Sequence, residues 1–119
     1  MEIIVPGIPV SVNHAFLTTS SGRRILNDAG RAYREVAGWE TRAAVLRDGW
    51  RWSGSWLRLT IKIYRPNNRR FDTHNQTKVL LDGLADGLDV DDKWYLVHEE
   101  IPEIDKANPR AVITIEQEA

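Results

Sequence analysis

One stretch, residues 56–64, most constrains what the chain can fold into, because apolar and polar side chains alternate along it. From position 57 onward, the odd positions hold only leucine and isoleucine, whereas the even positions hold Arg, Thr, Lys and Tyr. Successive side chains of a strand point to opposite faces. The pattern therefore predicts a β-strand with one buried face.

Two helices are expected, one on each side of this strand in the sequence. The first, at about residues 29–48, can be capped by Asn27 or Asp28 and can end at Gly49. Its expected apolar face, read at helical spacing, consists of Ala32, Val36, Trp39, Ala43 and Leu46. The second helix is expected at about residues 75–88. Its apolar face consists of Leu81, Leu84 and Leu88.

The remaining strands are expected at residues 2–10, 94–101 and 111–116, with short hairpin strands around residues 23–26. This order of elements predicts an α+β fold, in which a small mixed sheet of about four strands carries two main helices on one face. A chain of 119 residues is expected to form a single domain, residues 1–119. Tryptophans in the linker at residues 50–55 can seal a core edge, stack on bases or serve a dimer contact, and sealing is the preferred interpretation.

Charge is unevenly distributed along the chain, although the formal net charge is only −1. Residues 1–71 contain twelve Arg and Lys against five Asp and Glu, whereas residues 72–119 contain four against twelve. A face that gathers the basic residues can bind a polyanion even when the whole chain is slightly acidic. The alternative is an ordinary charged surface.

Composition argues against several classes of protein. The chain has no cysteine, which excludes a disulfide framework and a thiolate metal site. No apolar run approaches the roughly 18 residues that cross a bilayer, and the N-terminus lacks the pattern of a signal peptide. These features fit a cytoplasmic protein.

A group of polar side chains around the second predicted helix forms the candidate site. Asp72, His74 and Asn75 lie at its start, and Lys78 and Asp82 follow on one side of it. Two aspartates, at positions 91 and 92, come after its end, where the next strand can carry them back toward the helix start. Carboxylates brought together from separate segments bind Mg²⁺, which can activate water and stabilise charge on a phosphodiester.

Basic residues near this group suit a phosphate-containing substrate. Lys78 would stabilise negative charge that develops during attack on a phosphodiester. Arginines can hold the flanking phosphates. The candidate DNA contacts are Arg23, Arg24, Arg65, Arg69, Arg70 and Asn75.

Each part of the group also has an ordinary structural explanation. Asp72 can simply cap the helix, and Lys78 with Asp82 can form a surface pair worth a few tenths of a kcal/mol. The aspartates at positions 91 and 92 can form a solvated turn. A lone histidine such as His74 is more often structural than a metal ligand.

These residues resemble the central motif of the RusA-type endodeoxyribonucleases, the Holliday junction resolvases. That family carries an arginine-rich approach, then Asp-x-Asp-Asn-x-x-Lys, then a helix with an Asp and a Leu, and then Asp-Asp. The corresponding residues here are Arg69-Arg70-Phe71-Asp72-Thr73-His74-Asn75-Gln76-Thr77-Lys78, then Asp82-Gly83-Leu84, then Asp91-Asp92. Asn13 and residues 28–34 also resemble the N-terminal part of the family, so the resemblance covers nearly the whole chain.

The resemblance implies a homodimer that binds a four-way DNA junction and nicks two strands symmetrically, with Mg²⁺ or Mn²⁺ as cofactor. Asp72 would match the first metal carboxylate of the family. Asp92 would match the carboxylate contributed after the helix, with Asp91 beside it, and Lys78 would match the catalytic lysine. The process served is left open among recombination, repair and phage DNA packaging.

His74 departs from the family motif, which has a second aspartate at this position. A neutral nitrogen in place of an anionic oxygen weakens affinity for Mg²⁺ and shifts the preference toward Mn²⁺ or other transition metals. Three interpretations follow. His74 is itself a ligand, or it contacts DNA or water while Asp82 or Asp91 completes the site, or the site is impaired and only junction binding remains. An active site is favoured, because Asp72, Asn75, Lys78 and Asp92 are all present.

Two further hypotheses compete with a nuclease. A binding module without catalysis would recognise junctions or duplex DNA through the arginines and would cut nothing. A structural or interaction protein would use the aromatic and acidic stretches as partner surfaces and would have no affinity for DNA at physiological salt. The acidic last third of the chain favours this second alternative, because acidic surface repels DNA.

Overall fold

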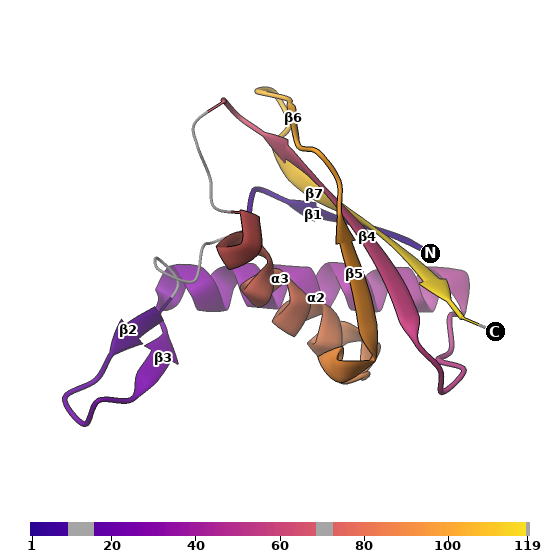
Figure 1. Ribbon diagram of the computed structural model, residues 1–119, viewed down its shortest axis with the longest axis horizontal. Coiled ribbons are helices and arrows are strands. Elements are labelled where there is room, and N and C mark those ends of the chain that lie inside the picture. The colour runs from indigo at the N-terminus through magenta and orange to yellow at the C-terminus, as the bar shows by residue number, and fades with distance from the viewer. Residues whose placement is uncertain (10–15, 69–72, 119) are drawn as a thin grey trace.

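The computed structural model describes residues 1–9, 16–68 and 73–118 of the chain (Figure 1). Its elements follow in the order β1 (Glu2–Pro6), β2 (Phe16–Thr18), β3 (Arg24–Leu26), α2 (Asp28–Asp48), β4 (Leu57–Arg65), α3 (Thr73–Leu88), η1 (Asp92–Trp94), β5 (Tyr95–Glu99), β6 (Glu103–Ile104) and β7 (Arg110–Gln117). The element η1 is one turn of 3-10 helix. Within these residues, no helix has the length and apolar character that a membrane span requires.

The main sheet has five strands in the order β1-β7-β4-β5, with the short strand β6 paired to the end of β4. Strand β7 is antiparallel to both β1 and β4, whereas β5 and β6 run parallel to β4. The predicted α+β fold with a mixed sheet and two main helices is therefore confirmed. The sheet has five strands instead of the expected four or so, because the short strand β6 also pairs with β4.

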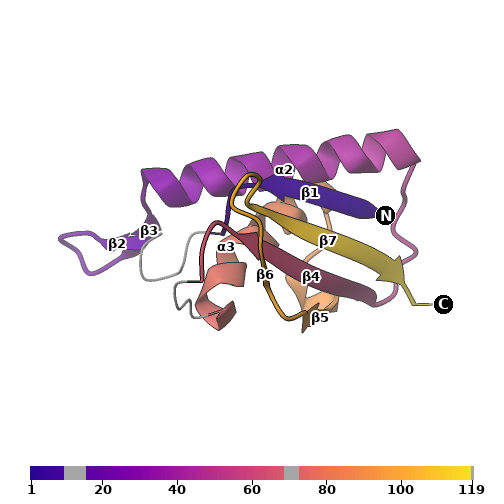
Figure 2. The same cartoon turned by 90° about the horizontal axis from the view of Figure 1, so that it is seen from above.

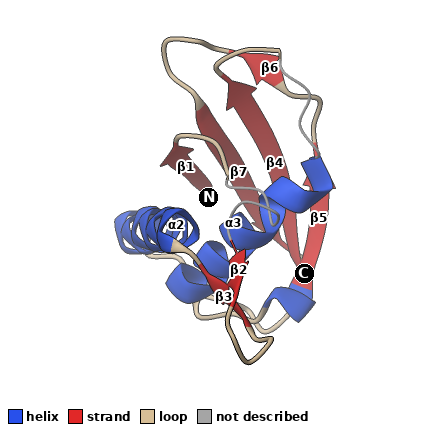
Figure 3. Ribbon diagram, turned by 90° about the vertical axis from the view of Figure 1, so that its left-hand side faces the viewer, coloured by secondary structure: helices blue, strands red, loops and turns tan. Residues whose placement is uncertain are grey.

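Both helices cover the same face of this sheet, as the end-on view in Figure 3 shows. The strand predicted from alternation is confirmed as β4, and its leucines and isoleucines are all buried. Ile3 and Val5 of β1 and the alternate residues Ala111, Ile113 and Ile115 of β7 are buried on the same side. The core thus lies between one face of the sheet and the helix layer, and Figure 2 shows α2 running along this layer.

Helix α2 has the predicted ends but a different buried face. The side chain of Asn27 caps its start by accepting the Gly30 N–H at 2.9 Å, and Gly49 ends it in the left-handed conformation at φ 62°. The predicted apolar face is wrong: Trp39 and Leu46 are each 69% exposed. Ala32 and Ala43 are exposed as well, and Val36 is only partly buried. The residues that face inward are instead Gly30, Tyr33, Ala37, Thr41, Ala44 and Val45.

Small residues at the crossing of α2 and α3 explain this rotation. A Cβ added at Gly83 would lie 2.6 Å from Cβ of Ala37, and one added at Gly87 would lie 2.6 Å from Cβ of Thr41. The two backbones therefore approach too closely for a large side chain at the contact, which turns the bulky Trp39 outward. Beside the crossing, Arg34 donates two hydrogen bonds to the carboxylate of Asp86, at 2.7 and 3.0 Å.

Three tryptophans pack together where β4 and β5 begin. The ring of Trp94 contacts Trp52 and Trp56 edge to face, with centroids 5.5 and 5.4 Å apart. Trp50 and Trp94 are partly buried against the core. The expectation that tryptophans seal a core edge therefore fits the structure, although Trp56 stays 46% exposed.

We predict that Gly83→Ala and Gly87→Ala each lower the free energy of unfolding by about 1–3 kcal/mol, because the added methyl must push the helices apart. Gly38→Ala is the matched control in α2. Its Cβ would meet nothing nearer than 3.5 Å, and alanine has the better helix propensity by up to about 1 kcal/mol. Urea unfolding measures all three, and equal losses in the three variants would contradict the close crossing.

Candidate functional site

The candidate site lies on a β4–α3–β5 unit, in which two parallel strands are joined through a helix. Helix α3 starts after the C-terminal end of β4 and runs back toward the beginnings of both strands (Figure 1). The helix start therefore lies near the C-terminal ends of the strands, and the helix end lies near their beginnings. This arrangement decides which predicted residues can meet.

Several predicted residues fall in or next to the part of the chain that the structure leaves undescribed. Asp72, Arg69 and Arg70 lie outside the described residues. His74 and Asn75 belong to the first turn of α3, but their side chains lie outside the description as well. In the sequence, Asp72 directly precedes Thr73, the first residue of α3.

Lys78 and Asp82 form the ion pair that was expected as an alternative to a catalytic role. Nζ of Lys78 lies 3.9 Å from Oδ1 of Asp82, one helical turn away. The lysine side chain is 56% exposed, so the pair is loose and screened by water. Breaking this ion pair therefore costs little free energy, so the Lys78 ammonium can bind another anion instead of Asp82.

Asp91 and Asp92 follow the end of α3 and begin η1. Oδ1 of Asp91 accepts the Lys93 N–H at 2.9 Å and caps the 3-10 turn. This hydrogen bond is the main reason that the pKa of Asp91 lies below its usual range. Both aspartates are exposed, and only one oxygen of Asp91 is used by the cap, so the pair offers several carboxylate oxygens to a cation.

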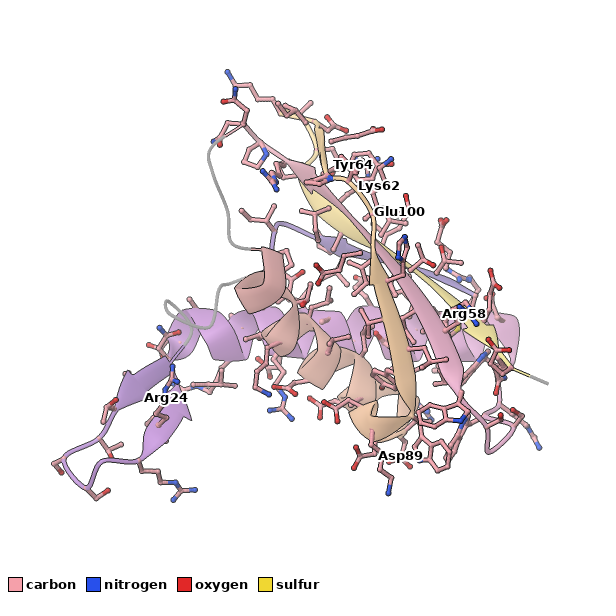
Figure 4. The ribbon with its side chains drawn as sticks, viewed as in Figure 1. Arg24, Arg58, Lys62, Tyr64, Asp89 and Glu100 are labelled. Carbon is pink, nitrogen blue, oxygen red and sulfur yellow. The ribbon has the colours of Figure 1, made fainter. Side chains whose placement is uncertain are left out.

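The expectation that the next strand carries Asp91 and Asp92 back toward the helix start is not met within one chain. Both residues precede β5, so they remain at the far end of α3. A helix of 16 residues is about 24 Å long. The residues that do return toward the helix start are those at the C-terminal end of β5. Figure 4 shows Glu100 near this end of β5 and Asp89 near its other end.

A groove at the C-terminal end of β5 contains residues that the sequence analysis missed. It lies between α3 and β5 and is lined by Thr77, Leu81 and residues 97–102, which include His98, Glu99 and Glu100. The missed signal was the order strand, helix, strand, which favours parallel strands whose C-terminal ends meet the helix start. These acidic side chains therefore share the end of the unit where Asp72 joins α3.

The donor types suit a hard cation, but the described residues by themselves do not assemble a site. Among the residues that the structure describes, no three His, Asp or Glu side chains come together as a cation site. Carboxylate oxygens are the ligands that Mg²⁺ and Mn²⁺ prefer, and His74 would add a nitrogen. A site that uses both Asp72 and Asp92 therefore requires the two ends of α3 to be brought together by something other than this fold alone.

The candidate DNA-binding arginines with described positions lie in two places. Arg23 and Arg24 are exposed on the β2–β3 hairpin, which stands out from the start of α2, and Figure 4 labels Arg24 there. Arg65 is the last residue of β4, on the same end of the unit as the start of α3. The hairpin and the helix start are thus the two basic regions that the structure can assign.

Other basic residues lie on the face of the sheet that carries no helix, and several of them form ion pairs with acidic residues. Arg58 donates to Glu118 at 2.7 Å, and Lys62 donates to Glu103 at 2.9 Å. The Arg110 guanidinium lies 3.9 Å from the centre of the Tyr64 ring. These contacts neutralise much of the positive charge on this face, which makes it a poorer surface for phosphates than the hairpin.

We predict that Asp91→Asn separates the capping role of this residue from its charge. The lowered pKa means that the carboxylate stabilises the fold above its unfolded-state pKa of 3.8, and that this stabilisation is lost as the pH falls through the lower folded value. Asparagine keeps an oxygen for the Lys93 N–H and does not titrate. Urea unfolding should show less acid sensitivity for Asp91→Asn than for the wild type, and a loss of stability at pH 7 for Asp91→Ala.

An unchanged acid sensitivity in Asp91→Asn would contradict this assignment. Asp89→Asn is the matched control, because Asp89 is also exposed and lies two residues earlier.

Comparison with known protein families gives one finding for this chain. A family model described as Endodeoxyribonuclease RusA matches residues 6–116. The match runs from the end of β1 to β7 and includes every candidate site residue. Curated proteins give no match.

Proposed function

Because the chain belongs to the RusA endodeoxyribonuclease family, whose members resolve Holliday junctions in DNA recombination and repair, we propose that it cuts four-way junctions with a divalent metal ion and as a homodimer. The observation that carries the proposal is the family match over 6–116, which spans the whole candidate site. Membership of this family identifies the chain as an endodeoxyribonuclease. The metal, the dimer and the residue roles are the proposed parts.

Asp72 and Asp92 would hold the metal, with His74 and Asp91 as additional ligands. Family members generally depend on divalent metals, and Mg²⁺ or Mn²⁺ bound here would polarise a water molecule and neutralise charge on the scissile phosphodiester. The exposed carboxylate oxygens of Asp91 and Asp92 fit this role. A nitrogen ligand from His74 would favour Mn²⁺ over Mg²⁺.

The length of α3 supports a site that is shared between two copies of the chain. Asp72 adjoins one end of the helix and Asp92 follows the other, so a single copy cannot supply both to one cation. A two-fold dimer in which the helices run antiparallel would place each start beside the partner's end. Such a dimer would contain two equivalent sites, as paired symmetric cuts require.

Lys78 would act from the second turn of α3, on the side of Asp82. Its loose pairing with Asp82 leaves the ammonium available to a phosphate oxygen, where it would stabilise the charge that develops in the transition state. Asn75 would donate to the DNA backbone from the preceding turn. The arginines at positions 23, 24, 65, 69 and 70 would hold phosphates of the junction arms.

The first test is cleavage of a synthetic four-way junction beside a linear duplex of the same sequence, with Mg²⁺ and with Mn²⁺. We expect paired symmetric nicks in the junction alone, better supported by Mn²⁺, and their loss in Asp72→Asn. Asp48→Asn serves as control, because Asp48 pairs with Arg47 at the last residue of α2, where no proposed site residue lies. Cleavage that persists in Asp72→Asn would contradict the proposed metal ligand.

The shared site makes a sharper prediction for mixed dimers. Asp72→Asn and Asp92→Asn should each be inactive alone, but mixed dimers of the two would contain one intact site. After subunit exchange in a one-to-one mixture, about a quarter of the wild-type sites should return. Nicking of single strands at that level would support sites made by two copies, whereas no recovery would place both aspartates in one copy's site.

Salt dependence tests the phosphate contacts separately from the chemistry. Each phosphate contact contributes about 0.9 to the slope of log affinity against log salt concentration. The double variant Arg23→Gln with Arg24→Gln should therefore reduce the slope by about 2 without altering the cleavage pattern. Arg58→Gln is the control, since Glu118 already holds that guanidinium, and an equal reduction there would contradict the assignment to the hairpin.

A junction-binding protein without chemistry is the second candidate, and His74 is the observation that favours it. A histidine in place of the family's second aspartate removes a negative charge from the metal site. Junction binding without nicks under either metal would support this alternative. A His74→Asp variant that gained Mg²⁺-dependent cleavage would locate the cause at this position.

A further inference from the structure

Two tryptophans that precede β4 leave much of their surface open to solvent. Trp56 is 46% exposed and Trp52 is 36% exposed. The core edge beside them is already covered by Trp50 and Trp94, which are partly buried against the core. Sealing of the core therefore does not account for the two outer rings. A contiguous exposed apolar patch that is rimmed by charged residues marks a surface for binding.

The loop that carries these rings is held in place by hydrogen bonds to the end of β7. The Ser53 N–H donates to Oε1 of Gln117 at 2.7 Å, and Nε2 of Gln117 donates to the carbonyl of Arg51 at 2.7 Å. The indole N–H of Trp52 donates to the carbonyl of Ser55, also at 2.7 Å. The loop is thus ordered before any ligand arrives, so little conformational entropy is lost when a flat molecule stacks on its rings.

The contacts with Trp94 occupy only part of each outer ring. Trp94 meets Trp52 and Trp56 edge to face, with interplanar angles of 62° and 63°. Both outer rings keep more than a third of their surface exposed, and the face of an indole ring is a surface on which a base can stack. We call Trp52, Trp56 and Trp94 the aromatic platform.

The aromatic platform adjoins the carboxylates that follow α3. Asp92 and Trp94 are the first and last residues of η1, which is one turn of 3-10 helix. Such a helix rises about 2 Å per residue, so the two Cα atoms lie about 4 Å apart along the axis of the turn. A nucleotide whose phosphate lies at Asp92 can therefore place its own base, or the base of its neighbour, on the platform.

Charged residues around the platform suit a base and its phosphates in different ways. Arg51 is exposed in the loop, and Nζ of Lys93 lies 6.0 Å from the centre of the Trp94 ring. Proteins bind unpaired nucleotides by combining positive charge with aromatic rings in this way. Asp89 and Asp91 are exposed just before η1. They would repel a phosphate backbone laid across the rings, but they do not repel an uncharged base.

We propose that the aromatic platform stacks on a base at the branch point of a four-way junction, next to the phosphodiester that is cut. The inference deepens the proposed function and rests on it. Taking a base out of its stack is easiest where the base is unpaired or poorly stacked. The branch point offers such a base, whereas a linear duplex does not. Trp52 and Trp56 therefore select branched DNA over duplex.

The affinities for a junction and for a linear duplex test this role. Fluorescence anisotropy measures both in the Asp72→Asn background, so that the DNA stays intact. We expect Trp56→Leu to weaken junction binding by about tenfold and duplex binding by less than about twofold. Trp56→Phe keeps a flat ring and should retain most of the affinity. Trp39→Leu is the matched control, since Trp39 is 69% exposed on α2.

A purely structural role of Trp56 predicts a different pattern. Leucine and phenylalanine would then replace the tryptophan about equally well, and both forms of DNA would be bound less tightly as the fold loses stability in urea. Stacking removes no phosphate contact, so the slope of log affinity against log salt concentration should not change in Trp56→Leu. Equal weakening of junction and duplex binding, or equal effects of leucine and phenylalanine, would overturn the inference.

Abasic nucleotides identify the base that stacks. Each branch-point nucleotide in turn is replaced by an abasic one, and the loss caused by Trp56→Leu is measured again. Changes in two groups that touch each other are not additive. At one position the loss should therefore shrink from about tenfold to about twofold or less. Additive losses at every branch-point position would overturn the stacking contact.

These results are distinguishable from a failure of the proposed function. Coupling between Trp56 and a branch-point base, in a chain whose wild type cuts no junction, would support the platform and overturn the nuclease proposal. Junction cleavage by the wild type without this coupling would overturn only the platform.

Discussion

The close crossing of α2 and α3 is the contact on which the rest of the arrangement depends. Gly83 and Gly87 let the α3 backbone approach Ala37 and Thr41 of α2 to a distance that no larger side chain permits. Both helices can then lie side by side on one face of a narrow sheet. The parallel pairing of β4 with β5 then gives α3 its direction and decides which end of the β4–α3–β5 unit carries the start of that helix.

The direction of α3 separates the two halves of the family motif. In the sequence its start follows Asp72, and its end leads to Asp91 and Asp92 at the opposite end of the β4–α3–β5 unit. A motif that is contiguous in sequence is therefore split in space by about 24 Å of helix. In the proposed dimer, each copy would supply the carboxylate that the other copy lacks at its site.

Electrostatics divides the surface in a similar way. Arg23 and Arg24 project on the hairpin, whereas Arg58 and Lys62 on the open sheet face are bound to glutamates. Exposed basic residues thus lie on the hairpin, and the acidic residues Glu99 and Glu100 lie at the end of β5. A polyanion would be guided to the first region, and the second is left for protein contact or for a cation.

The sequence by itself determined the element types, the family motif and most of the buried face of the sheet, because strand alternation and helix caps are local properties of the chain. It could not determine which face of α2 is buried, since helical spacing alone favoured Trp39 and Leu46, whereas the crossing at Gly83 and Gly87 demands small residues. It also did not place Asp91 and Asp92, because the parallel pairing of β4 with β5 is a long-range contact. Only the tertiary structure decided that these carboxylates lie at the far end of α3 and that β5 is an open edge.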